Sequence, residues 1–181
     1  MVENRKNEVN VRMLIDQNRK SLNFPKYADL IIEHPESVKE LVDLAVSGKA
    51  FHYPQYASWL LLHIARKRID LVHPFYQSII EGILTTRNRS ALRSLLGVSL
   101  CLPLESYRQV DFLDRLIQIA SDPESKPGHL LYANRKLEEF KKLYPDLQEE
   151  LNLIRELRNE IIASRGNTRF IKKTCRDLEI E

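Results

Sequence analysis

The chain has 181 residues, of which 43% are apolar and 29% are charged, and its formal net charge is +3. This length and apolar content suffice for one globular domain or one short repeat array with a buried core. The mild charge excludes strong attraction of the whole chain to a polyanion, and two cysteines exclude a disulfide framework. Only five glycines among many leucines, arginines and glutamates favour helix over sheet.

Residues 1–24 are mostly polar and lack the apolar core of a signal peptide. One apolar island, residues 9–15, interrupts them, so we predict either a partly ordered arm or a helix that caps the first repeat. Elsewhere no uncharged apolar run reaches the roughly 18 residues that a membrane span needs. The sequence therefore predicts a cytoplasmic protein with no membrane contact.

Between residues 25 and 164, apolar residues recur at helical spacing and are separated by short polar breaks. Pro25 and Pro54 stand where first helical turns are expected, and Gly48 is expected to cap the end of a helix. Asn88 or Ser90 is expected to cap another helix at its start. The pattern predicts four antiparallel helix pairs, which cover approximately residues 25–48, 54–86, 88–121 and 128–164.

The second and fourth pairs repeat one another at a fixed offset. Five positions recur 76 residues later as similar residues, an offset of two periods of about 38 residues. The positions are Ala57, Leu61, Ile64, Asp70 and Leu71, which correspond to Ala133, Leu137, Phe140, Asp146 and Leu147. The third pair departs from this pattern, because Arg108 stands where the other two have aspartate.

These repeated positions resemble a HEAT or armadillo-type repeat, in which small and apolar residues fill the seam between helices and an aspartate occupies the turn. The resemblance implies an all-α fold, a right-handed α–α superhelix of about four helix pairs, in one domain spanning residues 25–164. In such a fold Asp70 and Asp146 can cap the helix that follows. The C-terminal tail, residues 165–181, either docks on the last pair or stays mobile, and a non-repetitive helical bundle is the alternative architecture.

No catalytic, cofactor or metal motif is evident, so we expect no cofactor, no metal and, on balance, no enzymatic activity. The five histidines lack the spacing of a metal site. They are His34, His52, His63, His73 and His129. Residues 97–101 begin like a nucleophile elbow but lack its second glycine and the preceding strand, which favours a core segment with Cys101 buried.

Six basic residues cluster near two predicted inter-helix ends, namely Arg66, Lys67, Arg68, Arg87, Arg89 and Arg93. If these ends stack, the side chains can form a positive rim that meets phosphates or an acidic protein. The alternative is a set of solvated charges at helix C-termini, where the helix dipole favours them.

The leading functional hypothesis is a non-catalytic protein-interaction or scaffolding module that binds a protein or extended peptide on its concave face. The second helices would present a mixed-charge surface there, made of Tyr76, Gln77, Glu81, Arg108, Asp111, Arg115, Asn152 and Arg155. The alternative hypothesis is a nucleic-acid-binding or DNA-repair protein, because some alkyl-purine DNA glycosylases are built of HEAT-like repeats. Their strongly basic concave helices have no counterpart in this mildly charged chain.

Overall fold

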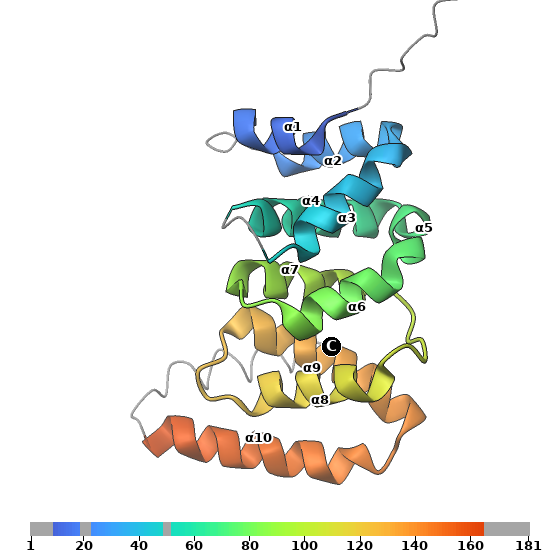
Figure 1. Cartoon of the computed structure of the whole chain (residues 1–181). Helices are drawn as coiled ribbons and strands as arrows, with labels where there is room; N and C mark the ends of the chain where they lie inside the picture. The colour runs from blue at the N-terminus through green and yellow to red at the C-terminus, as the bar shows by residue number, and fades with distance from the viewer. Residues whose placement is uncertain (1–8, 19–22, 49–51, 165–181) are drawn as a thin grey trace, which may run out of the picture. The chain divides into compact units, whose positions relative to one another are not determined.

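The computed structural model describes residues 9–18, 23–48 and 52–164, and every regular element within these ranges is a helix. The predicted all-α helical repeat fold is therefore confirmed (Figure 1). The chain forms two compact units, Met1–Pro103 and Leu104–Glu181, and each is described by itself. The third predicted pair is divided between the two units at Pro103.

The N-terminal unit contains a layer of first helices, α2 (Phe24–Glu33), α4 (Tyr53–Lys67) and α7 (Arg89–Ser99). Helix α4 lies between α2 and α7 and packs on both. Its leucines and isoleucine are buried, which fits the few polar positions that the sequence leaves in this helix. Local signals set the helix starts, because Pro54 lies in the first turn of α4 and Asn88 caps α7 by accepting a hydrogen bond from the Ala91 N–H at 3.0 Å.

A second layer consists of α3 (Val38–Val46) and α6 (Tyr76–Thr85), which pack on each other and on the first helices (Figure 1). Gly48 does not act as the predicted cap. The backbone leaves α3 at Ser47 with φ −65° and ψ 135°, and the Ser47 hydroxyl donates to the Leu44 carbonyl at 3.0 Å. An extended residue therefore ends this helix without a left-handed glycine.

The turns inside the first two pairs are themselves helical. A short 3-10 helix, Pro35–Ser37, precedes α3, while α5 (Ile69–Val72) and a second 3-10 helix, His73–Phe75, precede α6. Asp70 lies in the first turn of α5 and its carboxylate accepts two hydrogen bonds from Arg68, at 2.9 and 2.7 Å. Hydrogen bonds from the Arg68 guanidinium lower the pKa of Asp70. This turn aspartate therefore binds Arg68 and does not cap α6 as predicted.

Helix α1 (Val11–Asn18) covers the start of the N-terminal unit and contacts α3 and α4. Val11 and Ile15 are fully buried in that contact. The Val11 N–H donates to Glu40 at 3.0 Å, and the Tyr53 hydroxyl donates to Asp16. Apolar burial and these polar contacts together hold the apolar island of the N-terminal segment against the repeats.

The C-terminal unit contains α8 (Gln109–Ser121), α9 (Pro127–Leu143) and α10 (Leu147–Ser164). Helix α9 packs mainly on α8, where Phe112 and Phe140 meet edge to face with ring centroids 5.9 Å apart. Helix α10 also has its larger contact with α8. The fourth predicted pair therefore exists as two consecutive helices, but α8 supplies most of the packing for both.

Candidate functional site

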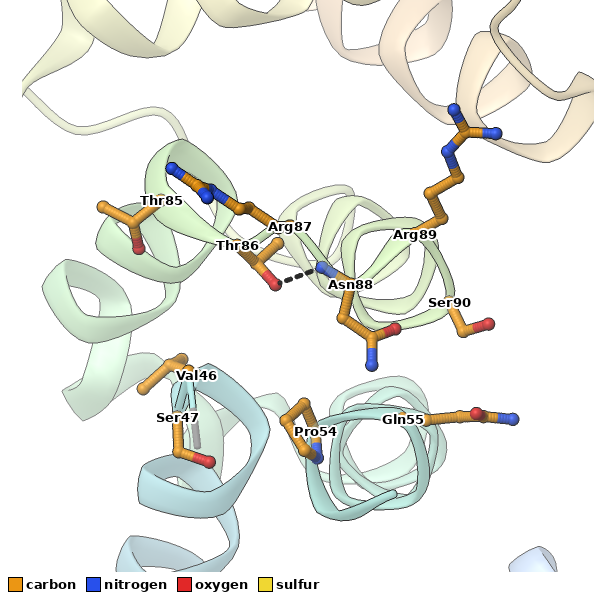
Figure 2. A pocket seen from close by; sticks show the side chains of 11 residues that line it. Val46, Ser47, Pro54, Gln55, Thr85, Thr86, Arg87, Asn88, Arg89 and Ser90 are labelled. Atoms are coloured by element: carbon orange, nitrogen blue, oxygen red, sulfur yellow. Dashed lines mark hydrogen bonds between the residues drawn. The ribbon is translucent and has the colours of Figure 1, made fainter. Parts of the chain in front are cut away.

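A groove opens in the N-terminal unit where four helix ends meet, and its cavity volume is about 760 Å³. We call it the repeat groove. It lies between the C-termini of α3 and α6 and the N-termini of α4 and α7 (Figure 2). Its lining residues are Val46, Ser47, Gly48, Pro54, Gln55, Thr85, Thr86, Arg87, Asn88, Arg89 and Ser90.

The groove floor is neutral and rich in hydrogen-bonding groups. In Figure 2 the Asn88 side chain extends toward Pro54, while Thr86 accepts a hydrogen bond from the Asn88 N–H at 3.2 Å. The lining residues include two arginines and no acidic residue. Arg87 and Arg89 extend away from Val46, Ser47 and Pro54, so their charges lie on the rim of the groove (Figure 2).

Two rows of polar side chains lead along the second helices into this groove. On α6, Gln77, Glu81 and Thr85 are spaced four residues apart, and the same spacing joins Lys39 and Asp43 of α3 to Ser47, which directly follows that helix. Residues at this spacing lie on one face of a helix. Thr85 and Ser47, the last residue of each row, both line the groove. We call these six residues the second-helix surface.

The structure separates the six basic residues into two groups. Arg87, Arg89 and Arg93 lie at or near the start of α7, which lines the repeat groove together with the start of α4. By contrast, Arg66, Lys67 and Arg68 lie at the far end of α4. A helix of 15 residues is about 22 Å long, so the groups do not form one continuous rim. The regular spacing of turns in the sequence did not reveal that successive turns lie at opposite edges of the stack.

The group at the end of α4 has a structural explanation. Lys67 forms an ion pair with Asp29 of α2 at 2.6 Å, and Arg68 binds Asp70 at 2.7 Å. Positive charge is also favourable at a helix C-terminus. These contacts join α4 to its neighbours and need no external partner.

Arg87, Arg89 and Arg93 lie near a helix N-terminus, whereas the group at the end of α4 lies at a helix C-terminus. Arg89 is the first residue of α7, Arg87 lies two residues before it, and Arg93 lies one turn further on. All three are exposed, and the first turn of α7 contains no acidic residue. Positive charge at a helix N-terminus is unfavourable, so helix stability does not explain these arginines.

The predicted concave-face residues divide between the two units. In the N-terminal unit Gln77 is exposed, Glu81 is half-buried, and Tyr76 is only 3% exposed and belongs to the core. In the C-terminal unit four residues bind neighbours in the same chain. Arg108 binds Asp111 at 2.7 Å, Asn152 accepts from Gln148 at 2.8 Å, and Arg155 donates to Glu138 at 2.9 Å. Arg115 is half-buried, with a longer contact to Gln118.

The C-terminal unit has a second hollow of about 460 Å³ at the starts of α8 and α10 and the end of α9. Its lining is mostly apolar and includes Val110 and Leu143, which are 72% and 55% exposed. The Tyr144 hydroxyl donates to the Gln109 side chain at 3.0 Å across this hollow.

Residues 9–18, 23–48 and 52–164 contain no group of three or more histidine, cysteine, aspartate or glutamate side chains placed to hold a metal ion. Among the helices of those same ranges, none combines the length and apolarity needed to cross a bilayer. His63 stacks on Phe24, and His129 is buried in α9.

These helices, stacked in two layers with short turns between them, define an α-helical repeat protein. The sequence matches the HEAT repeat domain over residues 13–175, so the chain belongs to the HEAT repeat family, and the matched region extends beyond α10. No curated protein and no solved structure gives a significant match.

Proposed function

We propose that this HEAT repeat chain is a non-catalytic module that binds an extended segment of another protein. The second-helix surface is the proposed contact face, and the repeat groove receives one end of the segment. HEAT repeats typically mediate protein interactions, and stacked second helices form extended binding surfaces in repeat proteins. The predicted residues Gln77 and Glu81 belong to this surface.

The observation that carries the proposal is that Arg87 and Arg89 line a groove with no acidic side chain in its lining, and that Arg93 follows one turn further along α7. The neutral amides and hydroxyls of the floor suit the peptide backbone, which carries one donor and one acceptor at most residues. The arginines suit carboxylates, with which they form charge-assisted hydrogen bonds. A segment with acidic side chains at the groove end is therefore the partner that this surface fits.

The test is selection from a random peptide library displayed on phage. We expect acidic peptides to be enriched on the wild-type protein, and the double variant Arg87→Glu/Arg93→Glu to weaken their binding by about tenfold, since each exposed charge pair contributes up to about 1 kcal/mol. The matched control is Lys26→Glu/Arg66→Glu, which makes the same charge change at exposed sites of the same unit that do not line the groove.

Three outcomes would overturn the proposal. The first is enrichment of peptides without acidic residues, and the second is equal loss of binding in both double variants. The third is tight binding of a short DNA duplex that weakens steeply with salt and exceeds the binding of every selected peptide, which would favour the nucleic-acid hypothesis. If the duplex binds only at low salt, and equally to both double variants, nonspecific charge attraction alone explains the duplex binding. That result would support the peptide proposal.

A further inference from the structure

Helix α10 has an exposed apolar stripe, which the described residues of its unit leave largely open. Leu153, Leu157 and Ile161 are 56%, 50% and 42% exposed and are spaced four residues apart along the helix. Leu151 and Arg158, on the side of α10 that packs on its neighbours, are almost completely buried. The exposed stripe is therefore additional to the face that holds α10 in the unit.

Acidic side chains flank this stripe. Four glutamates of α10 are exposed, namely Glu149, Glu150, Glu156 and Glu160. On the helical wheel Glu149, Glu156 and Glu160 lie along one side of the stripe and Glu150 lies in line with it, while Arg155 lies across the helix, where it pairs with Glu138 of α9. An occupant that complements this face needs apolar side chains interspersed with basic ones.

The segment directly after α10 has that composition. Residues 165–176 contain five basic residues and no acidic residue, with Phe170 and Ile171 near the middle. The basic residues are Arg165, Arg169, Lys172, Lys173 and Arg176. The HEAT repeat match continues through this segment to residue 175. We propose that residues 165–176 dock on the Leu153–Leu157–Ile161 stripe of the same chain.

Length and connection favour the chain's own segment over a separate partner. From Leu153 to Ile161 the stripe spans about 12 Å of helix, and 12 residues cover at least about 18 Å even at the helical rise. The segment is joined to α10 directly, which gives it a high effective concentration at this face. Docking would bury the exposed leucines and isoleucine and neutralise the flanking glutamates.

The test uses the native Cys175 in the full chain. A nitroxide spin label is attached at Cys175 of the Cys101→Ser variant, in protein with isotope-labelled leucine and isoleucine methyl groups. We expect the methyl signals of Leu153, Leu157 and Ile161 to lose most of their intensity, independently of protein concentration. The double variant Phe170→Ser/Ile171→Ser should restore these signals, whereas the matched variant Thr168→Ser/Thr174→Ser should not.

Three results would overturn this inference. The first is full methyl intensity along the stripe with the label in place. The second is loss of intensity that requires mixing spin-labelled chains with separate isotope-labelled chains, which would identify a second copy as the occupant. The third is unchanged broadening in the Phe170→Ser/Ile171→Ser variant, which would show proximity without apolar docking. None of these results bears on the repeat groove, so the two proposals stand or fall separately.

Discussion

Gly82 of α6 lies against Val46 of α3 so closely that a Cβ atom built on the glycine would be 2.6 Å from Val46 Cγ1. The same Cβ would lie 3.1 Å from Val46 Cβ and 3.2 Å from Leu95 Cδ1. Valine is short and branched at Cβ, so it cannot move aside as a flexible side chain would. The missing side chain therefore sets how closely α3 and α6 pack.

Gly82→Ala should lower the free energy of unfolding by about 1 kcal/mol. Overpacking destabilises by about 1–3 kcal/mol, and the higher helix propensity of alanine offsets about 1 kcal/mol of this loss. Urea unfolding followed by the fluorescence of Trp59, the single tryptophan, measures the change. The double variant Val46→Ala/Gly82→Ala removes the obstructing methyl groups and should be less destabilised than the sum of the two single variants. Strict additivity would contradict the proposed contact.

The helices of this chain could be predicted from its sequence because their signals are local. Apolar residues at helical spacing, Pro54 in a first turn and Asn88 at a cap each act within a few residues, and each was identified. The left-handed conformation of Arg108, with φ 46°, also coincides with a departure from the repeat pattern, since Arg108 replaces the turn aspartate of the other repeats. Such local signals predict helix boundaries and turns without knowledge of the tertiary packing.

The groove could not be predicted, because helix stacking creates it. Val46 and Pro54 precede Thr86 by more than 30 residues in the sequence, and they meet it only because α3 packs on α6 and α4 packs on α7. For the same reason the sequence grouped six basic residues that form two separate groups, one at the end of α4 and the other at the start of α7. Arg158 likewise is only 6% exposed, although Glu156 and Glu160 on either side of it in the sequence are exposed.

Lys136 provides a test of a buried charge in the C-terminal unit. Its side chain is fully buried in α9, and its ammonium donates to Glu139 at 2.6 Å. Glu139→Ala should destabilise the unit by about 1–3 kcal/mol, because a buried ammonium loses an acceptor. Lys136→Met keeps the apolar stem and removes the charge, so it should be nearly neutral or stabilising. Urea unfolding followed by circular dichroism compares the variants.

The control for this pair is Glu150→Ala, which removes an exposed glutamate of α10 and should have little effect. In the double variant Lys136→Met/Glu139→Ala, most of the stability lost in Glu139→Ala should return. The interpretation would be wrong if Lys136→Met cost more than Glu139→Ala, because the charge itself would then stabilise the fold.

His63 should make the N-terminal unit less stable as the pH falls. Partial burial, followed by the nearby charges of Arg66 and Lys67, lowers the pKa of His63, which stacks on Phe24 with ring centroids 6.2 Å apart. The unfolded chain therefore binds a proton near pH 6.5 before the folded chain does. Stability should be complete above that pH and should decrease as the pH falls toward the lower pKa of the folded state.

Urea midpoints of wild type and His63→Gln, measured by Trp59 fluorescence from pH 8 to pH 5.5, check this dependence. Wild type should lose more stability than His63→Gln over this range. His73→Gln, at an exposed position in the turn before α6, is the matched control and should retain the wild-type slope. Equal slopes for wild type and His63→Gln would rule out His63 as the source.

Glu138 should produce the opposite type of pH dependence in the C-terminal unit. Partial burial alone would raise the pKa of Glu138, but hydrogen bonds from Lys141 and Arg155 outweigh it and lower the pKa below its ordinary value. The folded chain therefore releases this proton at a lower pH than the unfolded chain does. The stabilisation is present above about pH 4.3, the ordinary pKa of glutamate, and is lost as the pH falls through the folded-state pKa.

Glu138→Gln should therefore reduce stability near neutral pH by less than about 1 kcal/mol, since the side chain is 46% exposed and solvent screens the pair. The difference from wild type should disappear in acid, where the wild-type carboxyl is also protonated. Urea unfolding by circular dichroism at pH 7 and pH 3 measures both values, and Glu149→Gln controls for the loss of one exposed charge. A difference that persisted unchanged at pH 3 would mean that packing, and not the charge on Glu138, is responsible.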